Sequence, residues 1–147
     1  MHTTIQKFHD AVLAHDHDSV PALMAENIKF QPPTYWATWN GRDAVAAVLG
    51  HVNEVFTDFE YRRVMGAGKD WALEFQCKVD GLDCVGVDLI TLNDEGLMQT
   101  FEVVMRPYKT IGALRAAMPR IHPSSSTSRR YPRRGRPASG GPMTLCR

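Results

Sequence analysis

The sequence predicts an α+β domain in which three helices come first and an antiparallel sheet follows. Two observations lead to this prediction. Hydrophobic residues recur at helical spacing through residues 3–56, and from residue 60 onward extended runs are separated by strong turn signals. The chain has 147 residues, 44% of them hydrophobic, which is enough for one globular core and too short for two. We therefore expect one domain over residues 1–119.

Three helices are expected in the first part of the chain. The first covers residues 3–15, the second is short and begins at Asp18, a good N-cap residue, and the third follows Gly41. Their apolar faces, at helical spacing, consist of Ile5, Phe8, Val12 and Leu13 in the first, Val20, Leu23 and Met24 in the second, and Val45, Val48, Leu49, Val52 and Phe56 in the third.

A short extended segment and an aromatic loop separate the second and third helices. The extended segment covers residues 28–30 and is stopped by two consecutive prolines. The loop 31–41 then carries Tyr35, Trp36 and Trp39, a dense aromatic load for a loop. This pattern indicates a lid or rim that stacks on a ligand. The alternative is that these aromatic side chains make core or dimer contacts.

The second half of the chain has the pattern of strands. The expected strands are residues 60–66, 71–79, 82–92 and 97–106. Pro107 stops the last strand, and a final short turn of helix is expected over residues 111–118. The expected topology is therefore an antiparallel meander that follows the three helices.

The turn at Asp80 and Gly81 fixes the register of the first hairpin. This dipeptide is a strong type I′ signal, and a two-residue loop determines which residues face each other. Cys77 then faces Cys84, and Asp88 lies opposite a leucine on the more apolar face of the sheet. We therefore expect Asp88 on the inner face, under the helices.

The second turn, at residues 93–96, leaves two registers open. A four-residue loop places Asp88 opposite Phe101, whereas a three-residue loop places it opposite Glu102. We prefer the first register because it leaves no second carboxylate in the core. It turns Glu102 and Arg106 outward and three apolar side chains inward: Phe101, Val103 and Met105.

Charge is unevenly distributed along the chain. Residues 1–119 carry ten Lys and Arg against 16 Asp and Glu, whereas residues 120–147 carry seven arginines and no acidic residue. The folded part is therefore a poor candidate for binding nucleic acid. The segment 120–147 is rich in Ser, Arg, Pro and Gly, and it is expected to be a disordered basic tail.

The remaining signals predict a cytoplasmic protein without a cofactor or metal. Cys77, Cys84 and Cys146 are odd in number and irregularly spaced, which indicates neither a disulfide framework nor a zinc site. The histidines between residues 9 and 17 are interpreted as a solvated polar patch. No apolar run approaches the ~18 residues of a membrane helix, and no signal-peptide pattern is found, so no membrane partner is expected.

Three segments resemble known families. Residues 86–100 resemble the closing hairpin of ketosteroid isomerases, and residues 41–45, Gly-Arg-Asp-Ala-Val, resemble a segment shared by isomerases and limonene epoxide hydrolases. Residues 105–107, Met-Arg-Pro, resemble SnoaL-like proteins. The resemblance spans residues 3–118 and implies an NTF2-like cone: helices on a curved sheet around an internal pocket, with a homodimer formed through the outer sheet face.

The resemblance transfers only part of a catalytic set. Asp88 matches the isomerases' protonated carboxylic acid, which donates a hydrogen bond to the substrate oxyanion. The isomerases' oxyanion tyrosine falls at Phe8 and their general-base aspartate at Pro32, and neither residue has the required group. The epoxide hydrolases' catalytic positions are likewise occupied by residues without those groups: Phe75, Cys77 and Val103. Whether the protein is an enzyme stays open.

Asp88 is the main candidate for a functional side chain, as a pocket acid or ligand anchor. Burial without a cation raises the pKa of a carboxyl, and such groups concentrate in functional clefts. The alternative is a buried carboxylate satisfied by a backbone or tyrosine donor. Tyr35 and His51 are weaker catalytic candidates, and for His51 the preferred interpretation is a surface histidine. The expected ligand contacts are Phe8, Tyr35, Trp36, Trp39, Leu73, Phe75, Phe101, Val103 and Met105.

Three functions follow from these residues. The first is a SnoaL-like domain that binds an apolar small molecule in a pocket anchored by Asp88. The second is an isomerase, cyclase or hydrolase that uses Asp88 as acid or base on a polycyclic or terpenoid substrate. The third is a dimeric interaction scaffold without catalysis. Two or more polar groups near Asp88 favour the second, and a pocket filled by Trp36, Trp39 and Met105 favours the third.

Overall fold

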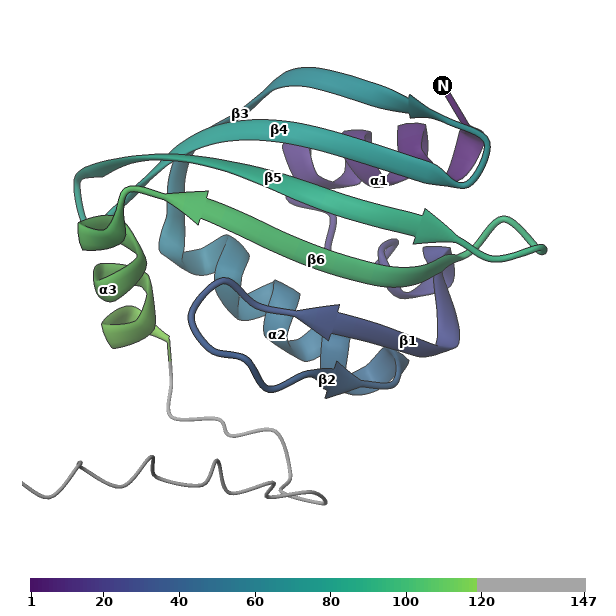
Figure 1. Ribbon diagram of the computed structural model, residues 1–147, viewed down its shortest axis with the longest axis horizontal. Coiled ribbons are helices and arrows are strands. Elements are labelled where there is room, and N and C mark those ends of the chain that lie inside the picture. The colour runs from purple at the N-terminus through teal and green to yellow at the C-terminus, as the bar shows by residue number, and fades with distance from the viewer. Residues whose placement is uncertain (119–147) are drawn as a thin grey trace, which may run out of the picture.

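A six-stranded mixed sheet forms one layer of the structure (Figure 1). The structure is a computed structural model, and it describes residues 1–118. The strands lie in the order β2-β1-β6-β5-β4-β3. Their bounds are Met24–Gln31 for β1, Trp39–Asn40 for β2, Phe56–Ala67 for β3, Asp70–Val79 for β4, Leu82–Leu92 for β5 and Met98–Arg106 for β6. The predicted tail, residues 120–147, lies outside the described residues.

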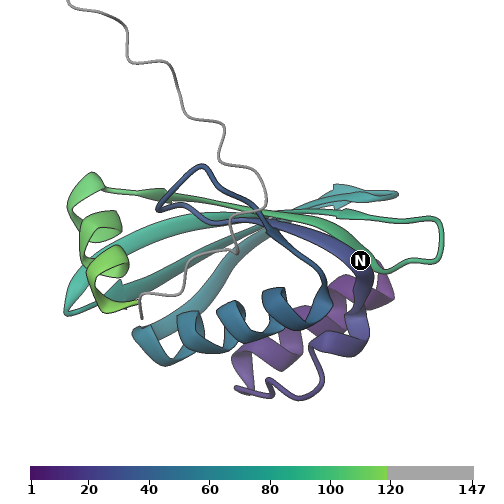
Figure 2. The ribbon, with the colours of Figure 1, turned by 90° about the horizontal axis from the view of Figure 1, so that it is seen from below.

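Two helices cover one face of this sheet, and a third lies at its end. Figure 2 shows α1 (Thr3–Leu13) and α2 (Arg42–Val55) side by side under the sheet, with α3 (Tyr108–Ala117) at the end where β6 finishes. His2 caps α1, because its Nδ1 accepts a hydrogen bond from the backbone N–H of Thr4 at 3.1 Å. No helix within residues 1–118 is long and apolar enough to cross a membrane.

The expectation of three N-terminal helices is wrong. Where the second helix was expected, the chain forms only a 3-10 turn, η1 (Pro21–Leu23), and then enters strand β1. The sheet is also mixed and not wholly antiparallel, because β1 runs parallel to β6. A register shift between Met24 and Lys29 breaks the two-residue alternation of β1, so the segment does not show a strand pattern in the sequence. Pairing with β6 decides its conformation.

The register of the first hairpin is confirmed. Cys77 pairs with Cys84, and both cysteines are free and buried. Asp80 and Gly81 have φ values of 50° and 75°, as a type I′ turn requires at both central positions. Asp88 is buried on the inner face, as expected.

Both registers considered for the second hairpin are wrong at Asp88, which pairs with Val103. The ladder shifts between Thr91 and Leu92, and this irregularity adds an offset that loop length alone does not reveal. The register found differs from the preferred one by two residues, so the faces are unchanged. Phe101 and Met105 are buried on the inner side with Asp88, as expected.

Candidate functional site

A cavity of about 810 Å³ lies between the inner face of the sheet and the helices. Its wall is built mainly from aromatic and aliphatic side chains of α1, α2, α3, the loop before β2 and the inner face of the strands. Eight residues singled out from the sequence line it: Phe8, Tyr35, Trp39, Phe75, Asp88, Phe101, Val103 and Met105. Ligand pockets in proteins have this size and apolar character.

Three predicted site residues lie elsewhere. The Trp36 side chain points away from the wall and is 83% exposed, because its neighbours Tyr35 and Ala37 take the lining positions of the loop. Leu73 is fully buried in the core beneath the cavity surface. His51 lies on α2 outside the lining, with Nδ1 3.9 Å from a carboxylate oxygen of Glu54.

Asp88 is the single acidic residue among the described residues that line the cavity. Strand β5 places its carboxyl on the inner face, between Leu73 of β4 and Val103 of β6. Burial raises the pKa of Asp88 to about 8, and a hydrogen bond from Tyr61 offsets only part of this effect. At neutral pH, Asp88 is therefore mainly protonated and neutral.

One oxygen of the Asp88 carboxyl is left for a ligand. The Tyr61 hydroxyl donates to Oδ2 over 3.4 Å, a long contact. Within residues 1–118, this is the single hydrogen bond that the Asp88 carboxyl makes, and Oδ1 has no partner. Among the same residues, every fully buried side-chain oxygen or nitrogen has a hydrogen-bond partner, so Oδ1 is not fully buried. It follows that Oδ1 faces the cavity space and, when protonated, offers a donor to whatever occupies it.

Tyr61 is one of the polar wall residues that sequence reasoning missed. It lies on β3, its ring stacks on His9 of α1 with centroids 4.7 Å apart, and Phe59 meets it edge-on at 5.0 Å. Burial raises the pKa of Tyr61 well above its usual range, and the nearby Asp88 adds to this effect. One signal in the sequence places Tyr61 on a defined face, namely its alternation with Phe59 along the strand. Register shifts in β3 hide the fact that Tyr61 reaches Asp88 on β5.

Among the described residues, the cavity wall offers an acid in Asp88 and a hydrogen-bond donor in Tyr61, and it carries no second carboxylate that could act as a base. Phe8 and Pro32, at which the resemblance places the isomerases' tyrosine and aspartate, both line the wall. The remaining titratable side chains on the described wall are His17, Tyr35 and Arg115. No group of three or more metal-ligating side chains occurs among residues 1–118. The geometry therefore supports binding of a polar acceptor more directly than a complete proton-transfer cycle.

The fold and the internal cavity define an NTF2-like protein. A family model described as a SnoaL-like domain matches residues 5–103, and the chain belongs to this SnoaL-like family. No curated protein matches the sequence.

Solved structures resemble the chain over most of its length. An uncharacterised protein conserved in bacteria with a cystatin-like fold, from Silicibacter pomeroyi DSS-3, shares 66% identity with a TM-score of 0.78, covering 80% of this chain and 84% of that one. A steroid delta-isomerase from Pseudomonas aeruginosa shares 30% identity with a TM-score of 0.76, covering 78% and 85%. An NTF2-like protein of unknown function from Mesorhizobium loti, at 20% identity and a TM-score of 0.65 over 71% and 88%, is similar in fold alone.

Proposed function

We propose that the protein binds a flat, apolar small molecule that presents a hydrogen-bond acceptor to Asp88. The observation that carries this proposal is a neutral carboxyl with one oxygen facing an otherwise apolar cavity. A carbonyl or hydroxyl oxygen is the chemical group that such a donor recognises.

Shape and chemistry both favour a flat ligand. The cavity volume suits a molecule of two to four fused rings, and aromatic side chains such as Phe30, Phe75 and Phe101 line the wall. Transfer of apolar surface from water supplies the affinity, about 25 cal/mol for each Å². The protonated Asp88 carboxyl fixes the orientation of the ligand, because a binding mode that leaves this donor unpaired inside the apolar wall is costly.

The open cavity also argues against a purely structural scaffold. That alternative requires aromatic and methionine side chains to fill the interior. Trp36 lies outside the cavity, and Trp39 and Met105 form part of a wall around about 810 Å³ of space. A void of this size in a core costs stability unless it is used or hydrated. Small-molecule binding is therefore the function that the interior supports best.

A matched pair of probes tests the role of Asp88. Fluorenone and fluorene share a flat three-ring skeleton and differ in one carbonyl oxygen. We expect the protein to bind fluorenone more tightly, and we expect Asp88→Leu to remove that preference while leaving fluorene binding in place. Asp88→Asn, which keeps a donor, should retain most of the preference. Equal affinity of the unaltered protein for both probes would refute the anchor role of Asp88.

The same pair gives a pH test. Above pH ~8 the ionised carboxylate no longer donates, so fluorenone affinity should fall by up to about tenfold for each pH unit while fluorene affinity stays constant. Asp88→Asn should abolish this dependence. A fluorenone affinity that is flat up to pH ~10 would contradict the protonated anchor.

A second candidate function is proton transfer on a polycyclic or terpenoid substrate, as in an isomerase, cyclase or hydrolase. Two observations favour it: the pKa of about 8 at Asp88, which suits an acid or base near neutral pH, and 30% identity to a steroid delta-isomerase. The test is incorporation of deuterium next to the carbonyl of cyclic ketones in heavy water, followed by NMR. Exchange that is catalysed by the protein and lost in Asp88→Asn would support this function. Absence of exchange would contradict proton transfer and leave ligand binding as the proposed function.

A further inference from the structure

The charges of the cavity wall are separated. Among the described lining residues, Asp88 is the one carboxyl and Arg115 is the one Lys or Arg side chain. Asp88 is buried on β5, whereas Arg115 is exposed on the last turn of α3. The cavity therefore has a neutral hydrogen-bonding group in its interior and a permanent positive charge at its rim.

Arg115 is held at the rim by the anchoring of α3. The neighbouring Leu114 is 2% exposed and packs with Phe75 and Met105, which themselves line the cavity. At the start of the helix, Thr110 is fully buried and donates from Oγ1 to the backbone oxygen of Asp83 at 2.8 Å. These two contacts fix the helix against the sheet, so the position of Arg115 on the wall follows from packing.

The guanidinium of Arg115 is available to a ligand. Within residues 1–118, no carboxylate lies at ion-pair distance from it, and helix α3 contains no acidic residue. The adjoining lining residues Gly112 and Ala116 are small, and a Cβ added at Gly112 would meet nothing within 4 Å. Access to the charge from the cavity side is therefore open.

Building on the proposed function, we infer that the natural ligand is an amphipathic anion: an apolar ring body with a neutral acceptor at Asp88 and a carboxylate or similar anionic group at Arg115. The inner end cannot take the anion, because no Lys or Arg among the described residues lines that part of the cavity, and burying an unpaired charge is costly. The rim can take it, because a guanidinium matches a carboxylate in charge and fork geometry. The ligand's orientation is thereby fixed.

The competing role for Arg115 is purely structural. A cation in the last turn of a helix interacts favourably with the carbonyl groups at the helix C-terminus. In that role, the charge of a ligand would make no difference to its affinity. The two roles are separated by comparing an anionic and a neutral probe that share one skeleton.

Anilinonaphthalene sulfonate and N-phenyl-naphthylamine form such a pair, since they differ in the sulfonate group. Both would be titrated by fluorescence into the full-length protein, Arg115→Gln and Lys109→Gln. Lys109 is exposed on the same helix but does not line the cavity, so it is the matched control for loss of one charge. The Arg-rich C-terminal segment is present in all three proteins and its contribution cancels in the comparison.

We expect Arg115→Gln to weaken sulfonate binding about fivefold, or ~1 kcal/mol, and to leave neutral-probe binding within about twofold. Lys109→Gln should change neither. Equal effects of both substitutions on the sulfonate, or no effect of Arg115→Gln, would overturn the inference.

Displacement by fluorenone separates failure of this inference from failure of the proposed function. If the neutral probe binds the unaltered protein and fluorenone displaces it, the cavity binds ligands and only the role of Arg115 is in question. If neither probe binds, or fluorenone displaces neither, the proposed function and the inference fall together.

Discussion

The ring of Phe75 on β4 lies directly over Gly86 on β5. The two residues are cross-strand partners, and a Cβ added to Gly86 would come within 2.3 Å of the Phe75 ring. The same ring stacks on Phe59 with centroids 5.2 Å apart and lines the cavity. Gly86 therefore leaves the recess in the sheet that the ring occupies, and the shape of the cavity depends on it.

Replacing Gly86 with Ala should lower the free energy of unfolding by about 1–3 kcal/mol, because the new methyl group overpacks the Phe75 ring. The displaced ring should also weaken binding of the neutral naphthylamine probe. Urea unfolding and probe titration measure the two effects. Gly50→Ala, in a helix where a Cβ meets nothing within 4 Å, should leave stability equal or higher. A Gly86→Ala cost that persists fully in a Phe75→Leu background would show that the two residues are not coupled.

Asp88 should make the stability of the protein depend on pH. Its pKa in the folded protein is raised from 3.8 to about 8, so the folded state binds more protons than the unfolded state between these values. Stability is therefore highest below pH ~4 for this group and falls as pH rises toward ~8, by on the order of 1 kcal/mol per pH unit. Asp88→Asn should remove this slope and stabilise the protein at pH ~8.

The control for this prediction is Asp83→Asn. Asp83 lies on the same strand and is exposed, with an oxygen 3.4 Å from the Lys78 ammonium. Its replacement should leave the slope between pH ~5 and ~8 unchanged. Urea unfolding across this range compares the three proteins. Parallel stability profiles for the unaltered protein and Asp88→Asn would mean that Asp88 titrates normally.

The sequence predicts some features of the site because they depend on local geometry. Asp80 and Gly81 determine the register of β4 and β5, and this register places Asp88 on the inner face. The register of the second hairpin is harder to predict from the sequence. The Asn93 side chain accepts hydrogen bonds from the backbone N–H groups of Glu95 and Leu97, and the ladder between β5 and β6 shifts beside this turn. Counting loop residues cannot reveal such a shift.

Other features depend on distant contacts. Tyr61 reaches Asp88 across β4, and the shifts in β3 on either side of it are not visible in the sequence. The spacing of Val20, Leu23 and Met24 predicts a helix that runs into strand β1. The sequence does not reveal the strand because its partner β6 lies about 70 residues later in the chain. Trp36 was expected on the wall with Tyr35, but adjacent residues of a loop point in different directions, and Trp36 is exposed.

We expect no ketosteroid isomerase activity from the unaltered protein. That reaction needs a base and two donors for the enolate oxygen, and the wall carries Phe8 and Pro32 at the positions that the resemblance assigns to the isomerases' tyrosine and aspartate. Loss of the base typically costs ~10²–10⁴-fold and loss of an oxyanion donor ~10²–10³-fold. An assay with a β,γ-unsaturated ketosteroid compares it with the double variant Phe8→Tyr, Pro32→Asp. Rapid turnover by the unaltered protein would reveal a base elsewhere in the cavity.

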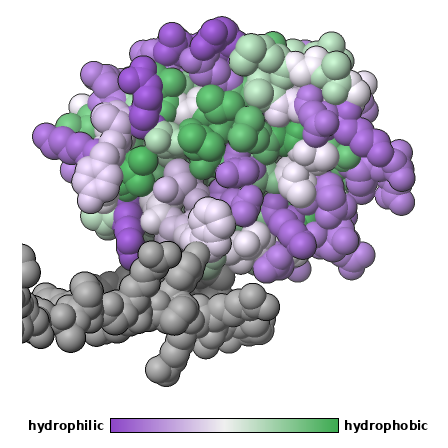
Figure 3. Space-filling view, in the orientation of Figure 1, coloured by the Kyte–Doolittle hydropathy of each residue, from purple (hydrophilic) through white to green (hydrophobic). Residues whose placement is uncertain are grey.

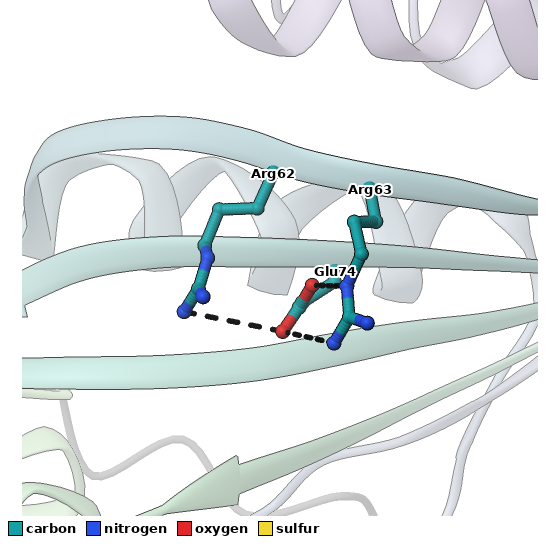
Figure 4. A network of polar contacts seen from close by, with 3 residues as sticks. All are labelled: Arg62, Arg63 and Glu74. Atoms are coloured by element: carbon teal, nitrogen blue, oxygen red, sulfur yellow. Dashed lines mark hydrogen bonds and ion pairs between the residues drawn. The ribbon is translucent and has the colours of Figure 1, made fainter.

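The outer face of the sheet carries exposed apolar residues. Figure 3 shows hydrophobic side chains gathered at the centre of this face, surrounded by hydrophilic ones. Val104 is 51% exposed and Leu89 is 40% exposed, on adjacent strands. Beside them Glu74 is buried, and Figure 4 shows it held by Arg63, through bonds to both carboxylate oxygens, and by Arg62 at 3.9 Å. The charge of Glu74 is thus neutralised within one chain.

We propose that this face packs against a second copy of the chain, because its buried charge is already paired and its apolar residues are not covered. Val104→Lys should shift the protein from dimer to monomer in light scattering with size-exclusion chromatography, since a charge at the centre of an interface is strongly unfavourable. The control Glu95→Lys, in the exposed turn before β6, should leave the mass unchanged. A monomeric unaltered protein would exclude this interface.

The parallel pairing of β1 with β6 has a consequence for the order of folding. Strands β3 to β6 are joined by short turns and pair with their neighbours in the chain, whereas Phe30 of β1 pairs with Phe101 of β6. Pairing across so long a stretch closes slowly because of its entropic cost. During synthesis, β1 can pair early with β2, but it remains without its β6 partner until residues 98–102 have emerged. Both phenylalanines line the cavity, and α3, which follows β6, supplies further wall residues, so we expect the wall to close late in folding.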